Sequence, residues 1–120
     1  MRWRFGTVGA FVTCTILAYG FAAARLAAQE PDGATLYKQH CRTCHGTEGV
    51  PSQRMLTLYP KLKSLADSAY LATLSTDSIA AITRSGVGDM KPYADKLSPA
   101  EIEAIARYVK TLASPAERQP

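Results

Sequence analysis

An all-α fold of four to five short helices is predicted by three features of the sequence. First, no stretch of the 120 residues alternates apolar and polar side chains as a half-buried strand would. Second, apolar residues recur at three- and four-residue spacings between loops that carry glycine and proline. Third, Ser98-Pro99-Ala100-Glu101 has the pattern of a helix N-terminus, with a capping box and proline at the first helical position.

The first helix is expected to begin after Asp32, whose carboxylate is a good N-cap, and to run to Cys41. Gly33 and Tyr37 fall on one face of this helix, four residues apart. Residues 46–60 contain two glycines and two prolines, and we expect them to form a loop.

Two further short helices are expected before the closing one. They span about residues 67–74 and 77–85, with Thr76 as the N-cap of the second and Gly86 as its left-handed stop. The closing helix starts at the capping box, and apolar side chains at helical spacing predict its buried face: Ile102, Ile105, Ala106, Val109 and Leu112.

Residues 1–28 have the layout of a secretory signal peptide. The first four residues include two arginines, residues 5–24 carry no charge, and small residues end the segment at Ala28. An uncleaved membrane anchor is the alternative, because about 20 apolar residues can cross a bilayer. Either segment would direct the rest of the chain to the periplasm, an oxidising compartment.

The net charge of the chain falls when residues 1–28 are left out of the count. The whole chain carries 14 Lys and Arg against 10 Asp and Glu, a net charge of +4, which would suit a nucleic-acid or membrane-surface partner. Three of the basic residues belong to residues 1–28, so residues 29–120 carry only +1. We therefore expect no nucleic-acid partner. The length allows one small domain, over residues 29–113, followed by a flexible tail over 114–120.

The segment Cys41-Arg42-Thr43-Cys44-His45 carries the chemistry. Two cysteines separated by two residues and followed at once by histidine are the attachment signature of c-type haem. Each thiol would add to one vinyl group at the haem edge and form a thioether, and one turn of chain would span the two vinyls. Since His45 follows directly, its imidazole would be the proximal ligand of the iron.

Three alternatives for the two cysteines have less support. A structural zinc site needs four ligands, and residues 29–120 offer only four, crowded into residues 40–45. A thioredoxin-like pair would be expected in a βαβ context, and the sequence predicts no strand. A disulfide between Cys41 and Cys44 would close a very small loop and stabilise little.

A haem bound in this way needs a ligand on its other face, and Met90 is the expected one. It lies 45 residues after His45, beyond two predicted helices, and Pro92 stiffens its loop. Met55 is only ten residues from His45 and is expected to be an ordinary apolar loop residue. Coordination by histidine and methionine is a standard haem scheme. The alternative for Met90 is a side chain that fills a gap in the core.

Together these segments resemble a class I cytochrome c of the small bacterial monohaem kind, over essentially the whole chain after residue 28. The resemblance implies the cytochrome c fold, with the helices wrapped around one covalently attached haem c. In that family a glycine and an aromatic residue of the first helix pack against an apolar and an aromatic residue of the last. Gly33 and Tyr37 match the first pair, and Ile105 and Tyr108 match the second.

The resemblance also implies two further residues beside the haem. Small bacterial members carry Pro-x-Leu after the haem motif, in which the proline carbonyl accepts the proximal histidine N–H and the leucine packs on the ring. Pro60 and Leu62 match this element and are expected to take these roles. Many members have proline directly after the methionine ligand, whereas here Lys91 stands between Met90 and Pro92.

The function implied is one-electron transfer and not catalysis, since His45 and Met90 together would leave no open position on the iron. We expect a monomer whose redox partners, such as a dehydrogenase, an oxidase or a bc-type complex, dock near the thioethers in a small, transient contact. Two alternatives remain. One is a haem subunit of a specific dehydrogenase or oxidase complex, and the other is a five-coordinate haem enzyme or sensor in which Met90 is not a ligand.

Overall fold

The computed structural model describes residues 29–113; the predicted signal segment 1–28 and the predicted tail 114–120 lie outside the described residues. Within residues 29–113 the only strand-like pairing is an isolated bridge between Val87 and Met90, which agrees with the predicted all-α class. The described segment has six helices and not the four to five expected: α1 Gly33–His40, α2 Arg42–His45, α3 Gln53–Leu58, α4 Ser68–Ala72, α5 Thr76–Ser85 and α6 Pro99–Leu112.

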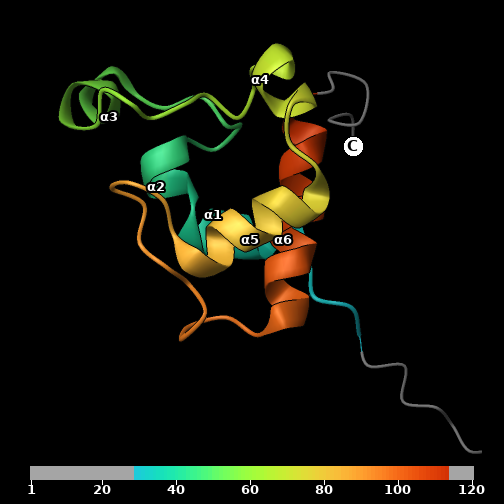
Figure 1. Cartoon of the computed structure of the whole chain (residues 1–120). Helices are drawn as coiled ribbons and strands as arrows, with labels where there is room; N and C mark the ends of the chain where they lie inside the picture. The colour runs from blue at the N-terminus through green and yellow to red at the C-terminus, as the bar shows by residue number, and fades with distance from the viewer. Residues whose placement is uncertain (1–28, 114–120) are drawn as a thin grey trace, which may run out of the picture.

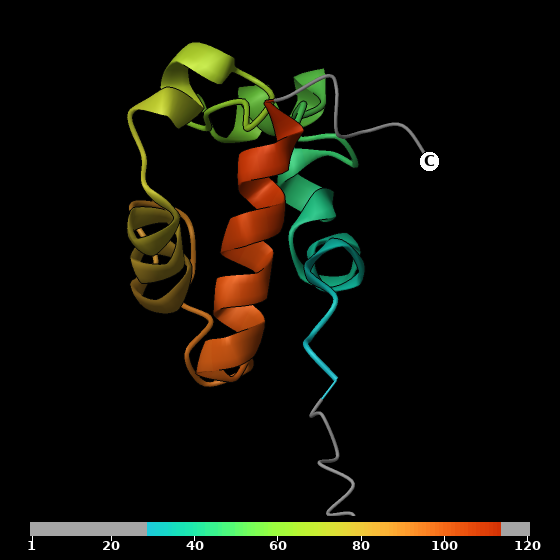
Figure 2. The ribbon, with the colours of Figure 1, turned by 90° about the vertical axis from the view of Figure 1, so that its right-hand side faces the viewer.

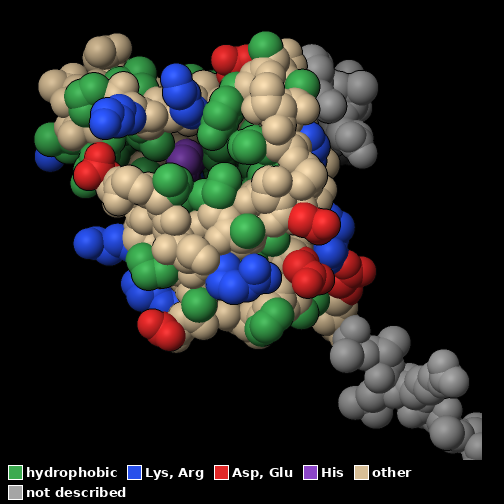
Figure 3. Space-filling view, viewed as in Figure 1, with side chains coloured by type: hydrophobic (Ala, Val, Ile, Leu, Met, Phe, Trp, Pro, Cys, Tyr) green, Lys and Arg blue, Asp and Glu red, His purple; other side chains and the backbone are tan. Residues whose placement is uncertain are grey.

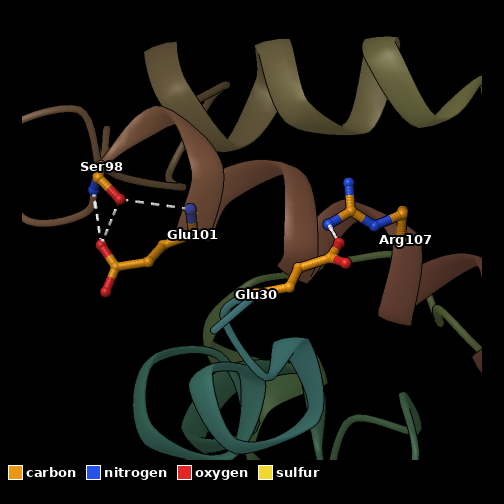
Figure 4. Close-up of polar contacts among 4 residues, drawn as sticks. All are labelled: Glu30, Ser98, Glu101 and Arg107. Carbon is orange, nitrogen blue, oxygen red and sulfur yellow. Dashed lines mark hydrogen bonds and ion pairs between the residues drawn. The ribbon is translucent and has the colours of Figure 1, made fainter. Parts of the chain in front are cut away.

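Helix α6 is the centre of the fold and lies between α1 and α5 (Figures 1 and 2). Its predicted N-terminus is confirmed: the Ser98 hydroxyl accepts the Glu101 N–H at 3.3 Å, and the Glu101 carboxylate accepts the Ser98 N–H at 2.8 Å (Figure 4). This reciprocal capping box satisfies two donors that a helix end otherwise leaves unpaired. Its predicted apolar face is buried as expected.

Helices α1 and α6 cross at close range because α1 begins with a glycine. A Cβ atom placed on Gly33 would lie 2.1 Å from the carbonyl oxygen of Ala104, so only glycine fits at this crossing. The rings of Tyr37 and Tyr108 meet beside it with centroids 5.3 Å apart. An exposed ion pair between Glu30, which precedes α1, and Arg107 of α6 lies nearby (Figure 4), and such surface pairs stabilise a fold little.

Helix α5 packs on the other side of α6 through Ile79 and Ala80, which are buried in the same core cluster as Tyr37. Its N-cap is Ser75, whose hydroxyl accepts the Ser78 N–H at 3.0 Å, so the expectation that Thr76 caps this helix was wrong by one residue. The helix ends at Gly86, with φ of 72° and an extended ψ of 169°. Gly86 therefore ends the helix with a positive φ, as predicted. Its ψ is extended, so it does not adopt the left-handed helical conformation that was expected.

Helix α3 lies within the segment that was predicted to be a loop, and it projects away from α6 (Figure 1). Ser52 caps it by accepting the Met55 N–H at 3.3 Å. No residue of α3 is buried, so its sequence lacks the apolar periodicity from which helices are recognised. No helix among residues 29–113 is long and apolar enough to cross a membrane.

Candidate haem site

A cavity of about 540 Å³ opens on one face of the molecule. Figure 3 shows this face, with hydrophobic side chains around a hollow in which a histidine side chain is visible. The walls come from α1 and α2, from the segment between α3 and α4, from α5 and the loop after it, and from α6. Five of the six predicted site residues line this cavity: Cys41, Cys44, His45, Leu62 and Met90.

The attachment motif forms a single helical turn. The N–H groups of Cys44 and His45 both donate to the carbonyl oxygen of Cys41, at 3.2 and 3.0 Å. This turn brings both thiols and the imidazole to the same cavity. Both cysteines are free, with Cys44 exposed and Cys41 half-buried, so the disulfide alternative is not formed here. Burial, with a smaller effect of neighbouring Cys44, raises the pKa of the Cys41 thiol to about 11.

His45 is a half-buried imidazole held in a form suited to metal ligation. Burial lowers its pKa, because an apolar environment disfavours the charged ring, and the neutral ring is the form that binds iron. Its Nδ1 atom is buried and has no hydrogen-bond partner among the described residues. The predicted bond to the carbonyl of Pro60 is therefore not present in this structure. Pro60 is exposed and does not line the cavity, and its role stays a prediction.

Met90 reaches the cavity from a tight turn. Val87 and Met90 exchange two backbone hydrogen bonds, of 3.1 and 2.9 Å, and so form a closed four-residue turn directly after α5. A Cβ atom on Gly86 would lie 2.4 Å from the Met90 carbonyl oxygen, so glycine is needed for the chain to fold back there. Met55 lies on α3 and does not line the cavity. Of the two methionines after residue 28, only Met90 is placed where it could be a ligand.

The lining fits a flat, apolar ring better than it fits a bare metal ion. Most of the lining is apolar, and its aliphatic part includes Leu65, Leu74, Ile82, Ile105 and Val109. No group of three or more His, Cys, Asp or Glu side chains within residues 29–113 is arranged to hold a metal ion, so the zinc alternative finds no ligand set there. The half-buried His45 imidazole and the two free thiols are the functional groups that a c-type haem requires.

Two tyrosine hydroxyls anchor this site, and the sequence did not identify either. Tyr37 donates to the carbonyl oxygen of Gly46, the residue after His45, at 2.9 Å. Tyr93 donates to the carbonyl oxygen of His40, the residue before Cys41, also at 2.9 Å. The sequence indicates that both positions are aromatic, but no local pattern indicates which distant carbonyl a hydroxyl will reach.

The rim of the cavity is basic, a second feature absent from the sequence predictions. Lys61, Lys63, Lys91 and Lys96 line it, and Asp89 is its one acidic residue. Residues 29–113 contain ten Lys and Arg and nine Asp and Glu. The cavity lining therefore carries a formal charge of +3, while the other described residues together carry −2.

Comparison with known proteins supports the same kind of site. Residues 28–109 match the family described as "Cytochrome C oxidase, cbb3-type, subunit III". Among solved structures, the chain resembles the "KustC0563 c-type cytochrome" at 34% identity and a TM-score of 0.61, over 68% of this chain and 96% of that one.

The chain is also similar to two curated relatives, one named a cytochrome c6 and the other an oxidase subunit. Chloroplastic cytochrome c6 of Chlamydomonas reinhardtii is 33% identical over 82% of this chain and 64% of its own length. The cbb3-type cytochrome c oxidase subunit FixP of Azorhizobium caulinodans is 32% identical over 67% of this chain but only 26% of its own length. This chain thus spans slightly under two thirds of the first relative and about a quarter of the second.

Proposed function

Because the chain belongs to the c-type cytochrome family described as cytochrome c oxidase, cbb3-type, subunit III, we propose that it is a one-electron carrier with one covalently attached haem c. Cys41 and Cys44 would hold the haem through thioethers, and His45 and Met90 would be its axial ligands. The observation that carries the proposal is that one cavity receives all four of these side chains.

When bound, the haem supplies a reversible one-electron ferric/ferrous couple. The residues of the chain would confine it to that chemistry. His45 and Met90 would both bind the iron, so no position on it would be left for a substrate. A thioether sulfur in an apolar cavity favours the ferrous state and raises the reduction potential relative to ligation by two nitrogens. Leu62 and the aliphatic lining would keep water away from the iron.

The charge of the rim supports an acidic redox partner. Four lysines and one aspartate surround the opening through which a haem edge would be reached. Complementary charge accelerates the encounter of transient partners, and electron carriers need contacts that form and dissociate quickly. We therefore propose that the periplasmic dehydrogenase, oxidase or bc-type complex that exchanges electrons with this protein presents a negatively charged surface to this rim.

A second candidate function is a haem subunit of one oxidase or dehydrogenase complex. The family description and the similarity to FixP favour it. In that case residues 5–24 would remain as a membrane anchor, and the same ligands would serve a fixed partner. The mass of the protein purified from membranes and from the periplasm separates the two, because it reports both cleavage of the signal segment and addition of haem.

The proposal is tested by the spectrum of the protein made with the haem-attachment machinery. We expect a pyridine haemochrome typical of two thioethers, a sulfur-to-iron charge-transfer band in the near infrared of the ferric protein, and little affinity for azide. A high-spin ferric spectrum with ready azide binding would instead indicate the five-coordinate enzyme or sensor. Absence of covalent haem would refute every function that depends on it.

A further inference from the structure

We propose that Tyr93 is a positioning residue that holds the Met90 loop against the haem-attachment segment. The inference rests on the proposed function, in which Met90 is the distal ligand. Tyr93 lies three residues after Met90, and its hydroxyl donates to the carbonyl oxygen of His40 at 2.9 Å, across 53 residues of sequence. The bond therefore joins the loop that carries one axial ligand to the residue that precedes Cys41.

The acceptor is a carbonyl at the end of α1 that its own helix does not satisfy. The N–H groups of Cys44 and His45 donate to Cys41 and not to His40. Among the described residues, the Tyr93 hydroxyl is the only donor found for the His40 carbonyl oxygen. Burial raises the pKa of Tyr93, which keeps its hydroxyl protonated as a donor at neutral pH.

The rest of the Tyr93 side chain is fixed as well. Its ring meets the His40 ring edge-on, with centroids 6.2 Å apart, and the Lys96 ammonium lies 5.6 Å from its centroid. The Tyr93 N–H donates to the carbonyl oxygen of Thr83 on α5 at 3.1 Å. Tyr93 is thus bound to α5 through its backbone and to α1 through its side chain, so it fixes the position of the loop end.

Within residues 29–113, the Met90 turn has no comparable anchor of its own. Its hydrogen bonds run between Val87 and Met90 within the turn, and Val87 is 62% exposed. The turn can therefore move as a unit about Gly86 on one side and Tyr93 on the other. Loss of the Tyr93 hydroxyl would release one of these two ends and increase the population in which Met90 has left the cavity.

The test is the substitution Tyr93→Phe in the holoprotein, which removes the hydroxyl and keeps the ring. Exogenous imidazole can bind the ferric iron only when the methionine has left, so its apparent affinity measures the open population. One hydrogen bond of ordinary strength corresponds to roughly a fivefold increase in imidazole affinity. We also expect the near-infrared charge-transfer band to disappear at a lower temperature than in the unmodified protein.

Tyr37→Phe is the matched control. It also removes a tyrosine–carbonyl hydrogen bond of 2.9 Å, and Tyr37 is fully buried, so its cost in global stability should be at least as large. Its bond lies entirely within residues 37–46, on the attachment side of the cavity, and does not involve the Met90 loop. If global stability governed imidazole binding, this variant would bind imidazole at least as well as Tyr93→Phe.

The inference is supported if Tyr93→Phe raises imidazole affinity roughly fivefold while Tyr37→Phe changes it less than about twofold. It is overturned if the two variants change affinity equally, or if Tyr93→Phe has no effect. The unmodified protein reports separately on the proposed function. A ferric protein without the charge-transfer band would show that Met90 is not a ligand, which would overturn both proposals at the first measurement.

Discussion

The substitution Gly33→Ala offers the most direct test of how the fold closes. The Cβ atom it adds would lie 2.1 Å from the carbonyl oxygen and 2.6 Å from the carbonyl carbon of Ala104, both backbone atoms of α6. The third neighbour, Cβ of Tyr108, would be 3.1 Å away. Because the obstacles are backbone atoms and the root of a side chain, no change of rotamer can relieve the contact, and the two helices must separate.

The size of the effect follows from that separation. The Ala104 oxygen must retreat by about 0.9 Å to reach 3.0 Å, the separation below which real Cβ contacts are essentially never found. This movement also loosens the contact between Tyr37 and Tyr108, whose ring centroids are 5.3 Å apart. Overpacking of this kind costs about 1–3 kcal/mol. Because the obstacles are backbone atoms, we take the upper end of this range, about 3 kcal/mol. The gain in helix propensity is at most about 1 kcal/mol, which leaves a net loss of about 2 kcal/mol.

The assay is guanidinium unfolding of the ferric holoprotein, followed by far-ultraviolet circular dichroism, together with the melting temperature. A loss of about 2 kcal/mol corresponds to a fall of roughly 8–16 °C for a domain of this size. Gln39→Ala, on the exposed side of α1, is the control and should change stability by less than about 0.5 kcal/mol. A Gly33→Ala protein as stable as this control would refute the claim that close approach of α1 and α6 requires glycine.

Three further predictions concern the site, its rim and the capping box. Met90→Ala should keep the haem attached but abolish the near-infrared band and lower the reduction potential, measured by redox titration; an unchanged potential would show that another residue is the ligand. Lys61→Glu with Lys63→Glu should slow reduction of ferricyanide at low ionic strength by about tenfold. The control Lys38→Glu with Arg84→Glu makes the same change in net charge at two residues that do not line the cavity, and it should slow the reaction less. If both double variants slowed the reaction equally, the rim would be excluded as the docking surface. The hydrogen bonds from Ser98 lower the pKa of Glu101 in the folded protein. Ionised Glu101 therefore stabilises the fold at pH values above its pKa in the unfolded chain, near 4.5. This stabilisation is lost as the pH falls through the lower pKa of the folded protein. Glu101→Gln should therefore lose less stability between pH 6 and pH 3 than the unmodified protein, and identical acid profiles would contradict this linkage.

Helix ends that are marked by a few neighbouring residues were predicted correctly from the sequence. The capping box of α6 lies within four residues, and the Asp32 N-cap bonds the Ala34 N–H at 3.0 Å, as the sequence predicts. Helix α3 was not predicted because it buries nothing, so it lacks the periodic pattern that tertiary packing imposes. The motif helix α2 was not predicted as a separate element because its four residues are too few to show a period.

For the site, sequence reasoning identified the residue types but not all of their partners. Five of the six predicted residues meet at one cavity because each lies in a motif with a known chemical role. The partner of His45 Nδ1 was not found in this way: the Pro60 carbonyl was expected only from the family resemblance, and Nδ1 has no hydrogen-bond partner among the described residues. The bond from Tyr93 to His40 spans 53 residues, and its existence depends on how α1 and α5 each pack against α6.

The core and the cavity share their side chains, and this explains how so small a domain can be stable. Tyr37, Ile79, Ile105 and Val109 belong to the buried cluster and also line the cavity. In a domain of about 85 described residues the core is modest, and its margin of stability is small. A bound haem would cover the cavity side of these residues and complete the same apolar layer that α1, α5 and α6 form. Substitutions at these positions should therefore change reduction potential and stability together, whereas substitutions on α3, which buries no residue, should change neither.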